Sequence, residues 1–224
     1  MQAAGFIFAL IAGLYALALW NNARVLRRAE YIQEYNWPAQ LLDKLQQKYP
    51  HFERKETSLV SRGLRQYFLS YLKGGLRPVS MPSQVADELW HGFILYTREY
   101  DAFCKQAFGR FFHHTPAVML SSERRSNNEG LRRVWWQSCK LENIDPSNAT
   151  RLPLIFALDT KLDIPNGYRY VADCSGLRRN GDLISQCGGD FTSTSIDGGT
   201  NGFGDGDGGS DGGGGDGGGC GGGG

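Results

Sequence analysis

The distribution of glycine limits which part of this chain can fold. Residues 188–224 hold 20 of the 31 glycines and six aspartates, but no lysine or arginine. A segment that is more than half glycine buries too little apolar surface to offset the conformational entropy that it would lose on folding. We therefore predict that residues 188–224 form a disordered, acidic tail and that the folded part lies within residues 1–187.

The charge balance changes when this tail is set aside. The whole chain has 24 basic and 23 acidic residues, whereas residues 1–187 have 24 basic and 17 acidic residues, a net charge of +7. A nucleic-acid-binding surface needs basic residues interleaved with exposed aromatic residues, or a recognised module. The basic pairs here are scattered, so we do not predict nucleic-acid binding. Attraction to an anionic membrane surface is a simpler use of the positive charge.

Residues 3–20 contain no charged side chain. Their number is near the lower end of the roughly 17–25 residues that span a bilayer as a helix. Three arginines follow within eight residues of Trp20, and the positive-inside rule places such a cluster on the cytoplasmic side. We predict a single-pass transmembrane anchor at residues 1–22, with the N-terminus outside and the C-terminal domain in the cytoplasm.

A cleaved signal peptide is the alternative interpretation of the same segment. Ala16-Leu17-Ala18 resembles a cleavage site. However, no basic residue precedes the apolar run and the arginines follow it closely, which is the reverse of the charge pattern of a signal peptide. The sequence therefore favours the anchor.

Residues 23–187 show the apolar spacing of three and four residues that is typical of helices. We expect helices at residues 39–49, 57–73 and 84–108 and from residue 129 to about 144, with the anchor helix continuing to about Tyr35. Only residues 168–171 resemble a strand. The predicted fold is mainly α: one N-terminal transmembrane helix, a small bundle of about five helices at residues 23–187, and the disordered glycine-rich tail.

The segment from residue 87 to residue 116 carries most of the side chains that could perform chemistry. Three of the four histidines lie in it, namely His91, His113 and His114. Asp87 precedes His91 by four residues, so the two share one face of a helix. The other two histidines lie beyond Gly109, where the chain can turn back towards that helix.

This grouping predicts a candidate metal site formed by His91 with His113 or His114, and by Asp87 or Glu88. Zinc accepts such nitrogen and oxygen ligands, and another divalent metal is an alternative. The spacing matches no compact metal motif. We nevertheless predict no cofactor, because the interpretation that the sequence favours is that His91 and one of the later histidines are hydrogen-bonded residues with a structural role. General acid–base chemistry by His91 oriented by Asp87 is a further alternative.

A resemblance to a known family is carried by the same residues. The string DELWHGFILYTREYDAFC at residues 87–104, followed by FGRFFHHTP, resembles the glycine-rich domain-containing protein-like family. RLPLIFALDTKLDIPNGY at residues 151–168 resembles the bacterial branch of that group. The resemblance covers about residues 80–172, and the glycine-rich tail agrees with it. It implies a class of domain and no particular reaction. The further motif residues that carry it are Trp90, Tyr96, Tyr100 and Cys104.

No complete set of catalytic residues is visible, so we assign none. Cys104 lies thirteen residues after His91, about 20 Å away along a continuous helix and too far to act with it. The predicted function is a membrane-anchored, non-enzymatic interaction module with a protein partner still to be identified. The alternative is a membrane-bound, metal-dependent enzyme that uses His91, His113 or His114, and Asp87.

Overall fold

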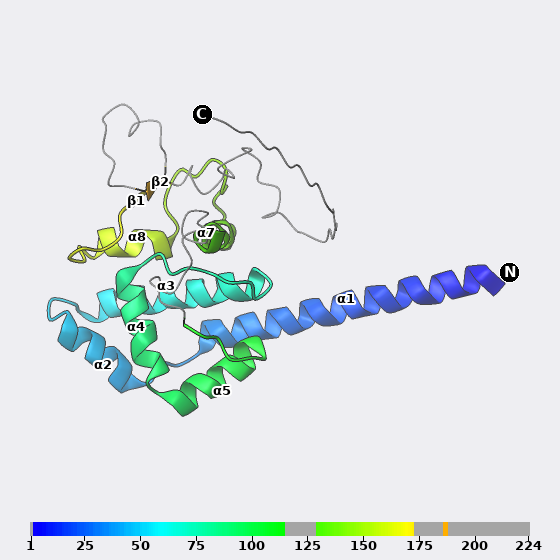
Figure 1. Cartoon of the computed structure of the whole chain (residues 1–224), viewed down its shortest axis with the longest axis horizontal. Helices are drawn as coiled ribbons and strands as arrows, with labels where there is room; N and C mark the ends of the chain where they lie inside the picture. Colours follow the sequence, from blue (N-terminus) through cyan, green and yellow to red (C-terminus); the bar gives the residue numbers. More distant parts are fainter. Residues whose placement is uncertain (1, 115–128, 173–185, 188–224) are drawn as a thin grey trace, which may run out of the picture.

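The computed structural model describes residues 2–114, 129–172 and 186–187. Within these residues the chain forms seven α-helices and one two-stranded sheet (Figure 1). The elements are α1 (Gln2–Glu34), α2 (Ala39–Lys48), α3 (Arg54–Lys73), α4 (Gln84–Ile94), α5 (Thr97–Phe108), α7 (Glu129–Leu141), α8 (Leu154–Lys161), β1 (Tyr170–Val171) and β2 (Gln186–Cys187). The prediction of a mainly α fold is confirmed. The predicted tail at residues 188–224 lies outside the described residues.

Helix α1 is continuous over 33 residues, about 50 Å, and it projects away from the other helices (Figure 1). Its N-terminal part exposes apolar side chains, from Phe6 at 78% to Trp20 at 56%. Its last third contacts α3 and α5 and buries Ala29 and Ile32. The helix is long and apolar enough to cross a membrane. The predicted boundary between residues 22 and 23 falls inside it.

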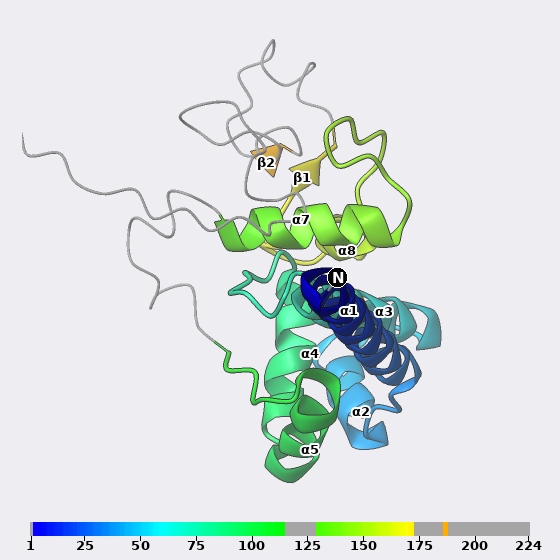
Figure 2. The ribbon, with the colours of Figure 1, turned by 90° about the vertical axis from the view of Figure 1, so that its right-hand side faces the viewer.

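Helix α3 lies at the centre of the bundle. Figures 1 and 2 show α7 and α8 on one side of it and α2 and α5 on the other. This position follows from its sequence, because Leu64, Tyr67, Phe68 and most of their neighbours on several faces are apolar and buried. Gly63 permits the close approach of α8, since a Cβ atom there would lie only 2.3 Å from Cδ1 of Leu158.

The expected helix over residues 84–108 is wrong, because the chain turns at Leu95 and Tyr96 between α4 and α5. Tyr96 has φ −83° and ψ 65°, outside the helical region. An unbroken helix would be about 37 Å long. The turn instead brings Phe93 of α4 and Phe103 of α5 together, with ring centroids 5.4 Å apart. No proline or glycine stands at the turn, so core packing determines its position.

The C-terminal elements also differ from expectation. No helix was expected after about residue 144, but α8 occupies Leu154–Lys161 after Pro153 at its N-cap. The described residues therefore hold six helices besides α1, where about five were expected. Of the strand expected at residues 168–171, only Tyr170–Val171 is present, as β1. It pairs in parallel with β2 in the register Tyr170 with Gln186.

A buried carboxylate on α8 fixes the start of α4. Asp159 accepts hydrogen bonds from the Ser83 hydroxyl at 2.7 Å and from the backbone N–H groups of Gln84 at 2.8 Å and Val85 at 3.2 Å. The Ser83 oxygen in turn accepts from the N–H of Ala86 at 3.2 Å. A negative charge at a helix N-terminus is stabilising. Asp159 therefore anchors α4 within one turn of Asp87.

Candidate metal centre

Two hydrogen bonds hold the segment after α5 against α4. The indole N–H of Trp90 donates to the Tyr100 hydroxyl at 3.1 Å, and this hydroxyl donates to the backbone carbonyl of Phe112. All three side chains are buried, and burial raises the pKa of Tyr100, so its proton stays in place. The Phe112 ring stacks on Tyr71 with centroids 3.8 Å apart and on Trp90 at 4.9 Å. The segment is thus fixed two residues before His114.

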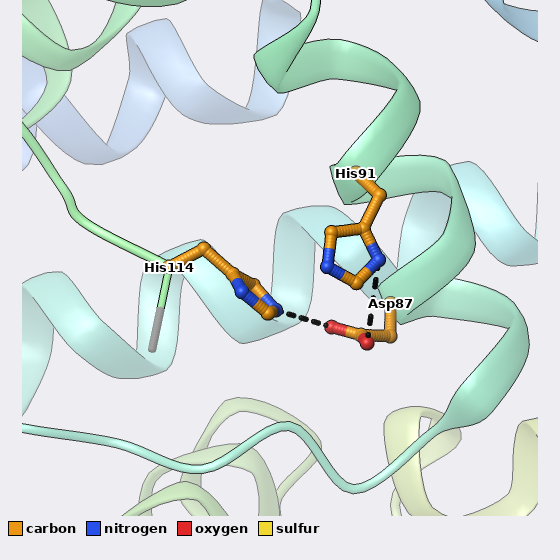
Figure 3. Close-up of side chains that lie close together, drawn as sticks. All are labelled: Asp87, His91 and His114. Atoms are coloured by element: carbon orange, nitrogen blue, oxygen red, sulfur yellow. Dashed lines mark hydrogen bonds and ion pairs between the residues drawn. The ribbon is translucent and has the colours of Figure 1, made fainter. Parts of the chain in front are cut away.

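This arrangement brings His114 next to Asp87 and His91 (Figure 3). One carboxylate oxygen of Asp87, Oδ1, lies 3.0 Å from Nε2 of His114, and the other, Oδ2, lies 3.5 Å from Nδ1 of His91. The two imidazole rings have centroids 4.2 Å apart. The three candidate ligand atoms all lie within 4.8 Å of one another.

The neighbouring side chains define the depth of the cluster. Trp90 meets the His114 ring edge-on at 4.6 Å, so His114 is the most enclosed member, with 14% of its side chain exposed. Asp87 is 29% exposed and His91 is 49% exposed. The Tyr67 ring lies 5.3 Å from that of Trp90, and burial and the nearby Asp87 carboxylate raise the pKa of Tyr67 and keep it neutral. Aromatic side chains therefore enclose the cluster at His114, and it is open to solvent at His91.

Not all predicted ligands belong to this cluster. His113 is exposed, and its ring packs on Phe111 with centroids 4.7 Å apart. Glu88 pairs instead with Lys48 of α2, at 2.6 Å between Oε2 and Nζ. The structure thus brings together Asp87, His91 and His114, and it places His113 and Glu88 elsewhere.

The remaining motif residues have structural positions. Tyr96 precedes the first turn of α5, and its ring lies 5.4 Å from the ammonium of Lys44. Cys104 is buried on α5, and burial raises the pKa of its thiol, which opposes a role as a nucleophile. Trp90 and Tyr100 position His114. Sequence reasoning named both residues but did not identify the hydrogen bond between them.

The donor set is suited to a divalent metal of the zinc type. Zinc binds imidazole nitrogen at about 2.0–2.1 Å, so two ligand atoms on a tetrahedral ion are about 3.4 Å apart. The three ligand atoms lie within 4.8 Å of one another, so binding an ion would require small movements of these side chains, of which His91 is the most exposed. Three protein ligands leave a fourth position open, as in catalytic rather than structural zinc sites.

Comparison with known proteins places the chain in a family. The family model UCP032817-like matches residues 27–191, a range that starts within α1 and contains Asp87, His91 and His114. No curated protein and no solved structure matches the chain. Because the matched range covers well over half of the 224 residues, the chain belongs to the UCP032817-like family.

Proposed function

We propose that this protein is a membrane-anchored interaction module whose helical body binds one zinc or similar divalent ion through Asp87, His91 and His114. The observation that carries the proposal is the position of the Asp87 carboxylate, with one oxygen 3.0 Å from His114 and the other 3.5 Å from His91. The two histidines come from separate segments, so their meeting depends on the tertiary fold rather than on local helix geometry.

The membrane part of the proposal rests on α1. Apolar side chains from Phe6 to Trp20 are exposed, which in water would be unfavourable. We propose that they cross the bilayer once, with the N-terminus outside and the helical body in the cytoplasm. The arginines that follow Trp20 support this orientation. A signal sequence at the same place is the competing explanation, and N-terminal sequencing of the mature chain distinguishes the two.

A metal ion held by three protein ligands would have a fourth coordination position free, and this position suggests the role of the ion. On a partner-binding surface, a histidine, cysteine or carboxylate of the partner would fill it and make binding dependent on the metal. The second candidate function is a metal-dependent enzyme, in which a water molecule occupies the position and becomes a nucleophile. The half-exposure of His91 favours access to the site in either case. We also propose a relation to the glycine-rich domain-containing protein-like family, which rests on the strings at residues 87–104, 108–116 and 151–168 and on the composition of the tail.

Metal analysis of the full chain, purified in detergent without chelators, tests the site. We expect about one zinc ion per chain in the wild type and loss of the ion in His91→Gln and His114→Gln, because each removes one of three protein ligands. His113→Gln is the matched control: it removes the adjacent imidazole, which lies outside the cluster, and should keep the metal. A metal content that is negligible in every variant would refute the site and leave a metal-free cluster with a structural role.

A further inference from the structure

Two arginines of α1 meet at the end of α5. Arg24 and Arg28 are four residues apart and share one face of α1. A Cβ atom on Gly109 would lie 2.2 Å from Nη2 of Arg28 and 3.5 Å from Nη2 of Arg24. Both guanidinium groups therefore lie close to Gly109, the C-cap residue that follows α5. Gly109 has φ 74°, which favours glycine there, and the atoms nearest to the position of a Cβ atom on it are the ends of the two arginine side chains.

This pair of positive charges has no acidic partner among the residues that the structure describes. None of the ion pairs found there involves Arg24 or Arg28. The C-terminus of α5 carries only a partial negative charge. The nearby Lys105 is already paired with Asp101 at 2.6 Å, and Arg110 donates to Tyr71 and to the backbone of Leu76. Two adjacent guanidinium groups thus remain available for an anion.

The position of Arg24 and Arg28 along α1 indicates which kind of anion they would bind. Arg24 also stacks over Trp20, with its guanidinium carbon 5.5 Å from the ring centroid, and tryptophan prefers the membrane interface. Along a helix, Arg24 lies about 6 Å beyond Trp20 and Arg28 about 12 Å beyond it. The headgroup layer extends about 5–8 Å beyond the hydrocarbon core, so the backbone of Arg24 lies at its level and that of Arg28 lies just beyond it. The guanidinium of Arg28 nevertheless comes close to that of Arg24, because both lie near Gly109. The end of α5 lies on the side of the body from which α1 projects (Figure 1).

We propose that Arg24 and Arg28, at the end of α5, form a binding site for the phosphate group of an anionic phospholipid. Guanidinium groups bind phosphate through two parallel hydrogen bonds, and an anionic leaflet attracts basic residues beside a membrane helix. The bound phosphate would lie beside the two guanidinium groups on their solvent side, and the lipid would hold the helical body at the membrane surface. This inference rests on the membrane insertion of α1 proposed above, but not on the metal site.

Native mass spectrometry of the full chain in mild detergent tests the site, with added phosphatidylglycerol as the anionic lipid and phosphatidylcholine as the zwitterionic one. We expect the wild type to retain phosphatidylglycerol in preference to phosphatidylcholine. In the double variant Arg24→Gln/Arg28→Gln this preference should fall about 10- to 30-fold, because two contacts with an anionic lipid are lost. The double variant Arg54→Gln/Arg62→Gln is the matched control, because it removes two exposed arginines of α3 and changes the net charge equally.

Three results would overturn the proposal. The first is equal retention of phosphatidylglycerol by the wild type and the Arg24/Arg28 variant. The second is an equal loss of retention in the Arg54/Arg62 control, which would indicate net charge alone. The third is displacement of the lipid by millimolar inorganic phosphate, which would indicate a site for free phosphate. A thermal unfolding curve of each variant in lipid-free detergent shows whether it is folded.

An alkaline wash distinguishes failure of the lipid-phosphate site from failure of the membrane anchor. Membranes that contain the chain are washed at alkaline pH, which releases peripheral proteins. If the chain is released, the anchor itself fails. If the chain stays in the membrane but shows no preference for the anionic lipid, only the phosphate site fails. The zinc content of the Arg24/Arg28 variant should equal that of the wild type, since the metal ligands are unchanged.

Discussion

The hydroxyl of Tyr100 is the most economical point at which to test how the candidate metal centre is positioned. It accepts from the Trp90 indole and donates to the Phe112 carbonyl, and the whole side chain is buried. Tyr100→Phe removes one oxygen atom and keeps the ring. It leaves a buried N–H and a buried carbonyl without their partner.

The expected loss of stability follows from these two groups. A buried polar group that loses its partner costs about 1–3 kcal/mol. Because single substitutions rarely cost more than about 4 kcal/mol, we expect a loss of about 2–4 kcal/mol in the free energy of unfolding for the two groups together. For a domain of this size each kcal/mol corresponds to about 2–4 °C, so the melting temperature should fall by about 4–16 °C. Tryptophan fluorescence of the full chain in detergent measures the transition.

A second measurement on the same variant concerns the metal. Without the hydrogen bond to Phe112, the segment that carries His114 is less restrained, so zinc affinity should fall even where the protein is folded. Tyr96→Phe is the matched control, since Tyr96 is partly exposed and its ring contact with Lys44 is kept, and its effect should stay within about 0.5 kcal/mol. Equal stability of Tyr100→Phe and wild type would refute the hydrogen-bond argument, and an unchanged zinc affinity would refute the positioning argument.

Further predictions concern other parts of the chain. Burial would raise the pKa of Glu142, but hydrogen bonds from the Leu154 N–H, Gln66 and Arg151 outweigh burial and lower it below 4.5. Ionised Glu142 therefore stabilises the fold above pH 4.5, and this stabilisation is lost as pH falls through the lower pKa of the folded state. In Glu142→Gln the free energy of unfolding, measured in urea, should fall less steeply with decreasing pH than in the wild type. An unchanged pH dependence would contradict this. Trp90→Ala should cost about 3–5 kcal/mol through the cavity that it leaves, and a loss below 1 kcal/mol would show that Trp90 is not a core residue. When fused after Gly224, a reporter enzyme that works only in the cytoplasm should be active. Activity of a reporter that works only after export across the membrane would reverse the proposed topology.

Much of the fold follows from helical spacing, but the break between α4 and α5 does not. Apolar residues recur at helical intervals on both sides of Leu95 and Tyr96, so the sequence contains no signal for a stop. The turn forms because Phe93 and Phe103 gain more by packing on the same aromatic core than by continuing one helix. Helix α8 was missed for a related reason, because it is short, follows Pro153 and buries several faces at once, which removes the amphipathic pattern.

The candidate site could be predicted in part, and the undecided choices depended on tertiary contacts. The pairing of Asp87 with His91 follows from their spacing of four residues, since it places both on one helix face. Choosing between His113 and His114 required knowing which way Phe112 points. Neighbouring side chains in an extended segment point to opposite sides, so burial of Phe112 turns His113 outwards and His114 inwards. Glu88 lies about 100° from Asp87 around α4 and therefore meets Lys48 instead.

The exposure of the cluster also bears on whether it exists for stability. A structural role would require histidines that are enclosed and fully hydrogen-bonded, yet the His91 side chain is 49% exposed and its nitrogen lies 3.5 Å from Asp87. Ion pairs of this exposure contribute at most about 1 kcal/mol. The segment that carries His114 is already held by the buried hydroxyl of Tyr100 and by the stacked ring of Phe112. The fold therefore needs little from Asp87 and His91, whereas metal binding needs both, which is why removal of His91 should affect metal content far more than stability.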